Sequence, residues 1–234
     1  MSRYVLVTGT DTGVGKTVTT AAVCCWHLAG GRDVVVVKPT QTGVRVGEPG
    51  DIDEVRRLSG LAQGSAHELL RLPEPLAPES AALRSGTPIP AVADLAAQIA
   101  ERTERGPDAS HVVLVEGAGG VAVRLDLHGG TALDLGRALE WHGDVEVIVV
   151  TRAGLGTLNH TVLTVEAVRA AGLPVAGLVI GSWPADPDLA AVSNLQDLPR
   201  VSGARLLAAI PAGVGAAAPL DFQAAAPGWF GRLS

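Results

Sequence analysis

A glycine-rich segment near the start of the chain has the composition of a phosphate-binding loop. Residues 9–17 read GTDTGVGKT, between an apolar run and an alanine-rich stretch. Glycines let backbone N–H groups converge on phosphate oxygens, and a following helix adds its dipole. Lys16 would reach the β- and γ-phosphates of a nucleotide, and the Thr17 hydroxyl would bind Mg²⁺. Because the loop is one residue longer than the G-x-x-x-x-G-K-[ST] pattern, a glycine-rich turn without a ligand is the alternative.

Charged residues at the ends of two further apolar runs extend this candidate site. Lys38 precedes Pro39, which we expect to end a strand because proline cannot donate to the ladder. A lysine there could hold a second anionic group; the alternative is a solvated lysine. Glu116 is followed by glycines and alanine, and its carboxylate is a hard oxygen ligand of the kind that Mg²⁺ prefers. The alternative is an exposed acid at a strand end.

Two aspartates follow the second apolar run and compete for a third ligand position. Asp51 is the first candidate and Asp53 the nearest alternative, both in an expected loop. An aspartate in such a place also commonly forms a turn or caps a helix, so a structural role stays open for either.

The segment GLGTLNH, residues 154–160, lies between an expected strand and an expected helix. Free N–H groups at that helix start could bind a carboxylate without any side chain. Thr157 or Asn159 could equally be a simple helix cap. The six histidines show neither metal-ligand spacing nor a Ser/His/Asp arrangement, so we expect no catalytic histidine.

Alternating strands and helices would position these residues. We expect strands at residues 4–7, 33–38, 111–116, 145–151, 175–180 and 206–210, and helices at 17–29, 92–103, 160–171 and 188–198. Continuous apolar strands separated by helices indicate an α/β fold, a parallel sheet with helices on both faces, here as a single domain over residues 1–234. Residues 43–50 and 72–90 look like loops at the edge that carries the motifs.

Composition excludes several classes of protein. The 234 residues contain 18 Lys and Arg against 24 Asp and Glu, with no basic block, which argues against a nucleic-acid binder. No apolar run approaches the length of a membrane helix, and the first residues lead directly into a strand. The adjacent Cys24 and Cys25 are poorly placed for a disulfide and are expected to be buried on a helix. These features predict a cytoplasmic protein.

The motifs together resemble those of the dethiobiotin synthetase family. The resemblance rests on GTDTGVGKT at residues 9–17, Lys38-Pro39 with Thr42-Gly43, VEGAGG at 115–120 and GTLNH at 156–160, in the same order and spacing. It runs from about Tyr4 to about Gly213, and the longer loop with Asp11 is similar to that family's own. The resemblance implies a P-loop NTPase-like fold.

It also implies an activity: Mg²⁺- and ATP-dependent carboxylation of 7,8-diaminononanoate (diaminopelargonate) with CO₂ or bicarbonate, and closure of a ureido ring through a carbamic-phosphoric anhydride. Lys16 and Lys38 would be catalytic, and Thr17, Asp51 and Glu116 would hold Mg²⁺. Substrate would contact Thr12, Lys38 and Thr42 and, in a homodimer, the partner's Gly156, Thr157, Leu158 and Asn159. Nucleotide would contact Gly13, Val14, Gly15, Lys16, Thr17, Val18, Asp51, Glu116, Gly117, Ala118, Gly119, Gly181, Ser182, Pro211, Ala212 and Gly213.

One departure from the family pattern concerns the nucleotide base. Many members that the chain resembles have Asn-Asp where this chain has Gly181-Ser182. An asparagine amide can both donate to and accept from a base edge, whereas glycine offers only its backbone. A strict preference for ATP over other nucleoside triphosphates therefore does not follow from the sequence.

Two other classes of function compete with this interpretation. Switch ATPases of the partition or division-site type share the fold, but they have a lysine where Asp11 stands, and many carry a basic or amphipathic tail that this chain lacks. A nucleotide-binding module without turnover would leave Lys38 and Glu116 without a role.

Overall fold

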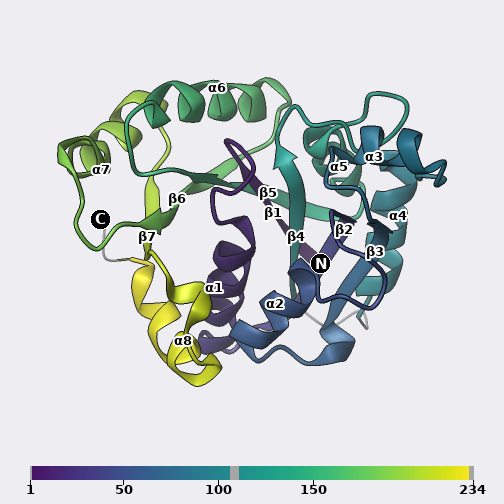
Figure 1. The fold of residues 1–234 in the computed structure, drawn as a ribbon, viewed down its shortest axis with the longest axis horizontal. Helices are drawn as coiled ribbons and strands as arrows, with labels where there is room; N and C mark the ends of the chain where they lie inside the picture. Colours follow the sequence, from purple (N-terminus) through teal and green to yellow (C-terminus); the bar gives the residue numbers. More distant parts are fainter. Residues whose placement is uncertain (1, 106–110, 232–234) are drawn as a thin grey trace.

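Runs of valine, leucine and isoleucine build one parallel sheet of seven strands, in the order β3-β2-β4-β1-β5-β6-β7 (Figure 1). The computed structural model describes residues 2–105 and 111–231. The strands are β1 (Ser2–Gly9), β2 (Asp33–Thr42), β3 (Ala66–Leu72), β4 (His111–Gly120), β5 (Gly143–Thr151), β6 (Val175–Trp183) and β7 (Leu206–Pro211). All neighbouring pairs are parallel. The expected α/β class is confirmed.

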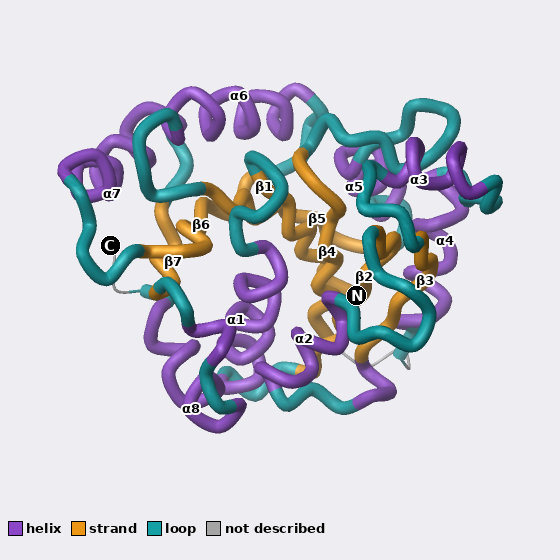
Figure 2. The backbone as a smooth tube through the Cα atoms, viewed as in Figure 1, coloured by secondary structure: helices purple, strands orange, loops and turns teal. Residues whose placement is uncertain are grey.

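Helices cover both faces of the sheet, because successive strand side chains point to opposite faces and both sets are apolar. The helices are α1 (Lys16–Ala29), α2 (Asp51–Ser59), α3 (Pro78–Ser85), α4 (Val92–Thr103), α5 (Ala132–Leu139), α6 (Thr157–Ala170), α7 (Leu189–Ser202) and α8 (Pro219–Ala225). One core joins Val5 and Val7 to α1, α2 and α8, and the other joins Leu6 to α4, α5, α6 and α7. Figure 2 shows α1, α2 and α8 on one side of the strands and α6 and α7 on the other.

The strand order places the candidate residues at one edge. β2, β4 and β1 are neighbours, and they carry Lys38, Glu116 and the glycine-rich loop respectively. Val37 pairs with Val115, and Val7 pairs with Glu116. The two strand-end charges and the loop therefore meet at the carboxyl edge of the sheet, where open α/β sheets bind ligands.

Pro39 does not end β2 as expected. The ladder with β4 stops at Val37, but β2 continues beside β3, with Lys38 opposite Glu68 and Thr40 opposite Leu70. A proline lacks one N–H, so it interrupts pairing at its own position, and the residues on either side keep their bonds to β3.

Several elements were missed because their sequences are short or half-polar. β3, reading AHELLRL, is an edge strand with half-buried side chains, and residues 72–90 contain α3 rather than one loop. Asp51 begins α2 instead of lying in a loop. α5 and α8 were also not expected; each has eight residues or fewer. Such lengths give too few turns for a clear periodic pattern.

The C-terminal segment packs back onto α1. Phe230 stacks on Trp26 with ring centroids 5.3 Å apart, and Trp229 meets Phe222 edge-on. Cys24 and Cys25 are buried on α1 as expected, and burial raises the pKa of Cys24 to about 12. No helix in the two described stretches combines the length and hydropathy needed to cross a membrane.

Candidate active site

The loop between β1 and α1 has the backbone shape of an anion site. Gly13 and Gly15 have φ of 70° and 95°, the left-handed region that glycine enters freely. Gly15 caps α1 without a side-chain hydrogen bond, so no side chain claims the first N–H groups of that helix. The space around Gly13 is open. These N–H groups are available to phosphate oxygens.

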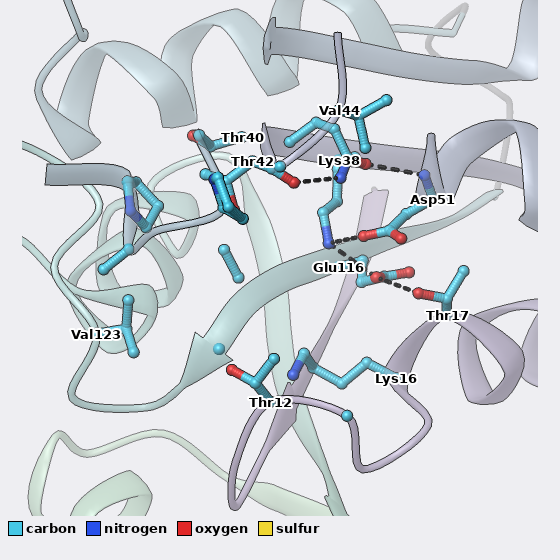
Figure 3. A pocket seen from close by; sticks show the side chains of 18 of the residues that line it. Thr12, Lys16, Thr17, Lys38, Thr40, Thr42, Val44, Asp51, Glu116 and Val123 are labelled. Carbon is cyan, nitrogen blue, oxygen red and sulfur yellow. Dashed lines mark hydrogen bonds and ion pairs between the residues drawn. The ribbon is translucent and has the colours of Figure 1, made fainter. Parts of the chain in front are cut away.

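Lys38 is the centre of a buried charge cluster (Figure 3). Its Nζ lies 2.6 Å from Asp51 Oδ2 and 2.8 Å from Glu116 Oε1, and the residue is 4% exposed. Burial alone would lower the pKa of Lys38, but Glu116 and Asp51 outweigh it and the pKa is raised. Lys38 is therefore held as an ammonium ion that pairs with two carboxylates.

Thr17 joins this cluster to α1. Its hydroxyl donates to the same Glu116 Oε1 that pairs with Lys38, over 2.9 Å. Three oxygen-bearing side chains that could bind a metal ion are thus brought together: Asp51 and Glu116 pair with Lys38, and Thr17 is bonded to Glu116. Mg²⁺ is commonly held by few protein oxygens together with substrate phosphates, so this donor set fits a nucleotide-bound Mg²⁺. Within the described residues, no group of three or more His, Cys, Asp or Glu could hold a metal without such help.

The second lysine, Lys16, lies on the loop side of the cluster. Its Nζ donates to the backbone oxygen of Asp11 over 2.9 Å. Burial lowers the pKa of Lys16, and the positive charge of Lys38 lowers it further. The Asp11 carboxylate pairs with Arg152 at 3.0 Å, which ties the loop to the segment after β5.

Of the two competing aspartates, Asp51 faces the cluster and Asp53 does not. Asp53 Oδ2 accepts from the Gly50 N–H at the start of α2, at 2.9 Å. Residues two apart on a helix point in nearly opposite directions. Because Asp51 and Asp53 both lie on α2, only Asp51 can face Lys38, whereas in a loop either aspartate could have done so.

These groups line a cavity of about 900 Å³. Its polar lining residues are Thr12, Lys16, Thr17, Lys38, Asp51 and Glu116, together with Thr40, Gln41 and Thr42. Its apolar lining residues are Val44, Pro75, Leu76, Pro78 and Val123. Figure 3 shows Val123 on the wall away from Asp51 and Thr17. The phosphate loop and several apolar side chains therefore line one space.

The apolar wall and Gln41 were not among the sequence-predicted residues. Residues 72–90 were expected at this edge, but prolines and leucines in a loop give no chemical signal of contact with a ligand. Gln41 lies one residue before Thr42, in a part of β2 that the sequence did not predict as strand.

The start of α6, predicted to face the substrate of a partner subunit, is not among the residues that line this chain's own cavity. The interpretation of Thr157 or Asn159 as helix cap is wrong: Gly156 is the N-cap, with φ of 92° and no side-chain cap bond. The Thr157 hydroxyl instead donates to the Arg152 carbonyl at 2.8 Å. The N-cap gives no side-chain hydrogen bond to the first turn of α6, but the Thr157 N–H donates to the Gly154 carbonyl at 3.3 Å. An anion would therefore bind the N–H groups that follow Thr157.

The segments predicted near a nucleotide base are not among the residues that line the cavity, and one of their residues, Gly181, lies against the phosphate loop. A Cβ on Gly181 would lie 2.1 Å from the Val14 carbonyl, and Gly215 packs against Val18. Pro211 ends β7, and the Ala212 N–H donates to the Trp183 carbonyl at 2.7 Å. Gly181, Ser182, Pro211, Ala212 and Gly213 are thus grouped by β6 and the turn after β7.

Replacing Thr17 with valine should weaken binding of the Mg²⁺–nucleotide complex by about tenfold or more, near 1.4 kcal/mol. Valine keeps the shape of threonine but removes the oxygen that meets Glu116. Titration calorimetry with a non-hydrolysable ATP analogue, with and without Mg²⁺, measures the effect. Thr19→Val is the matched control, since the buried Thr19 hydroxyl has no hydrogen-bond partner within the described part of the chain. Equal affinity for both variants would remove Thr17 from the ligand set.

One protein-family profile and several named proteins match this chain over most of its length. The family profile described as "AAA domain" matches residues 3–215. A Streptomyces avermitilis protein named ATP-dependent dethiobiotin synthetase BioD is 53% identical over 96% of this chain and 90% of its own. Proteins of the same name from Rhodococcus jostii and a Mycobacterium species are 53% and 45% identical, covering 96% and 97% of this chain and 93% and 98% of their own.

Solved structures at lower identity share the fold. The cell division ATPase MinD of Pyrococcus furiosus is 20% identical, with a TM-score of 0.50 over 90% of this chain and 84% of its own. Chloroplast FtsY from Physcomitrella patens is 15% identical, with a TM-score of 0.51 over 95% and 65%. These likenesses place the chain among P-loop NTPase folds.

Proposed function

Because the chain belongs to the family of ATP-dependent dethiobiotin synthetases, we propose that its cavity closes a ureido ring on diaminopelargonate with CO₂ and ATP. The protein is an ATP-dependent ligase of biotin biosynthesis that forms dethiobiotin, as the names of its relatives say.

One observation carries the assignment of the site: the phosphate loop and the Lys38 cluster share a single cavity. Lys16 and Thr17 follow the phosphate loop, and the Thr17 hydroxyl donates to Glu116, one of the two carboxylates that pair with Lys38; all of them line this cavity. A nucleotide on the loop would bring its γ-phosphate toward Lys38. The apolar wall at Val44, Pro75 and Leu76 suits the hydrocarbon chain of the diamine.

The reaction needs positioning and charge neutralisation more than a nucleophilic side chain. One amine of the substrate attacks CO₂ and loses a proton, which gives a carbamate. A carbamate oxygen attacks the γ-phosphorus and ADP leaves. The second amine then attacks the carbonyl carbon and loses a proton, the ring closes, and phosphate leaves with the former carbamate oxygen. Lys38 would stabilise the carbamate and Lys16 the phosphoryl group in transfer, with Thr12 and Thr42 in contact with the diamine.

Thr17, Asp51 and Glu116 are the residues that would hold the Mg²⁺ of the nucleotide. When bound, the ion neutralises phosphate charge and so favours attack by an anionic oxygen. Backbone from residues 13–18 and 117–119 would surround the phosphates. Gly181, Ser182 and residues 211–213 would flank the base, and their contacts would be made largely by backbone groups.

The substrate carboxylate would be bound by a second copy of the chain. The first N–H groups of α6, at Gly156, Thr157, Leu158 and Asn159, lie outside this chain's own cavity and are not capped by a side chain. Leu155 and Leu163, beside them and on α6, are 93% and 63% exposed, as expected of residues that pack in a homodimer.

Sedimentation equilibrium should give twice the chain mass at micromolar concentration; a monomer at working concentration would contradict this arrangement.

The decisive experiment measures phosphate release with Mg-ATP and bicarbonate, with and without diaminopelargonate, together with the mass of the product. Diamine-dependent release and a product heavier by one carbonyl less two hydrogens are expected. Repeating the assay with other nucleoside triphosphates measures the base preference. Phosphate release that does not depend on diaminopelargonate would favour a switch ATPase instead.

A further inference from the structure

The helix that carries Asp51 is capped by a residue from another element. The N-cap of α2 is Gly50, which has no side chain, and the Asp51 N–H donates instead to Gln41 Oε1 on β2 over 2.8 Å. An N-terminal N–H without a partner is costly when buried, and a side-chain oxygen normally satisfies it from within the same segment. Here the side-chain oxygen comes from Gln41, which lies ten residues earlier in the sequence.

Both ends of the Gln41 amide are fixed. Its Nε2 donates to the Thr42 carbonyl over 3.0 Å, and the residue is 4% exposed. A Cβ on Gly50 would lie 3.0 Å from Gln41 Oε1, so the two residues are closely packed. Gln41 therefore holds one defined orientation between strand β2 and the first turn of α2.

The far side of the same loop is held by an ion pair. Arg71 contacts Glu68 at 2.6 Å and donates to the Arg45 carbonyl at 3.0 Å. That contact fastens residues 45–48 to β3 but does not reach Asp51. The pair also lies against Gly50, where a Cβ would be 2.9 Å from Arg71 Nη2, but Gln41 is the side chain that binds the Asp51 N–H itself.

We propose that Gln41 is a positioning residue: it fixes the start of α2 so that the Asp51 carboxylate stays beside Lys38 and in reach of the ion that accompanies the nucleotide. The inference rests on the proposed role of Asp51 as a ligand. Asp51 Oδ2 lies 2.6 Å from Lys38 Nζ although its side chain is 35% exposed, so packing alone does not hold it there. The carboxylate is attached to the backbone that Gln41 binds.

Loss of Gln41 should leave the fold intact. Asp53 still caps the Gly50 N–H, and α2 still packs through Ile52, Val55 and Leu58. We therefore expect the substitution to change the affinity for Mg²⁺ and not the folding of the protein.

The test uses Gln41→Met, which keeps the length of the side chain and removes both hydrogen bonds. We expect the affinity of the enzyme–nucleotide complex for Mg²⁺ to fall about tenfold, as for other residues that orient a ligand. Mg²⁺ titration of the complex with a non-hydrolysable ATP analogue measures this by calorimetry. Affinity for the analogue without Mg²⁺ should not change. Gln63→Met, at an exposed glutamine, is the matched control.

Asp51→Asn and the double variant separate this inference from the proposed function. If Gln41 acts through Asp51, the double variant binds Mg²⁺ no more weakly than Asp51→Asn alone. Losses that add, or normal Mg²⁺ affinity in Gln41→Met beside a clear loss in Asp51→Asn, would overturn the role of Gln41. Normal affinity in Asp51→Asn would instead overturn the ligand assignment. If Gln41→Met does not fold, Gln41→Asn, whose shorter amide cannot reach the Asp51 N–H, replaces it.

Discussion

Replacing Lys38 with alanine should lower dethiobiotin formation by a factor of about 10²–10³ and leave nucleotide binding largely intact. The factor is that of removing one charged or hydrogen-bonding group aimed at a developing anion in a site that excludes water. Lys38 is such a group: it is 4% exposed, and the cluster around it keeps it protonated. The phosphate loop and Lys16 are separate from it, so an ATP analogue should bind with affinity close to that of the unchanged protein.

The same substitution has a second consequence, which its controls must address. Glu116 is 2% exposed in the structure, and without Lys38 the Thr17 hydroxyl would be its one remaining side-chain partner among the described residues. Breaking a buried pair by removing one partner typically costs about 3–5 kcal/mol of stability. Lys38→Arg keeps the charge but changes its shape, so it should restore the free energy of unfolding more fully than the turnover. Normal turnover in Lys38→Ala, with confirmed folding, would show that the role given to Lys38 is wrong.

The part of the site that the sequence predicted is the part made by strand ends. Lys38 and Glu116 directly follow Val37 and Val115, the last pair of the ladder between β2 and β4, and in a parallel sheet the carboxyl ends of neighbouring strands share an edge. That rule brings them to the phosphate loop before any side chain is placed, and the structure has all three lining one cavity. Chemical type and strand direction were sufficient for these residues.

Asp51 and Gln41 show where the sequence alone was not sufficient: it named Asp51 but left Asp53 as an alternative, and it did not point to Gln41. Choosing Asp51 over Asp53 requires knowing that α2 begins there, and the nine residues of α2 are too few and too polar to show this clearly. Gln41 matters because its amide meets the start of that helix, a contact between two elements whose packing no local pattern encodes. The apolar wall from residues 75–78 likewise depends on how the turn after β3 folds over the cavity.

Gly181 shows how a departure from a family pattern can have a steric meaning. The sequence suggested a lost contact to the base, because glycine stands where similar proteins have asparagine. In the structure, a Cβ at this position would lie 2.1 Å from the Val14 carbonyl and 2.7 Å from Val150. A Cβ on Gly15 would in turn lie 2.6 Å from the Gly181 carbonyl. Strand β6 and the phosphate loop are in backbone-to-backbone contact here.

Gly181→Ala should therefore disable nucleotide binding although Gly181 does not line the cavity. A backbone carbonyl cannot move aside as a flexible side chain can, so residues 14–15 must shift and their N–H groups lose alignment with the phosphates. We expect affinity for an ATP analogue to fall by about a hundredfold, near 2.7 kcal/mol, and the free energy of unfolding to fall by about 1–3 kcal/mol, as in other overpacked sites. Calorimetry and chemical denaturation measure the two effects.

Gly64→Ala is the matched control, because a Cβ at Gly64 meets nothing within 4 Å and its φ is not positive. It should bind nucleotide normally and lose little stability. The two outcomes also separate the two interpretations of Gly181. If its role were base contact alone, alanine would alter the preference among nucleoside triphosphates and leave the binding of inorganic triphosphate unchanged. Displacement of the loop weakens the binding of every triphosphate, with or without a base, because all of them use the same N–H groups.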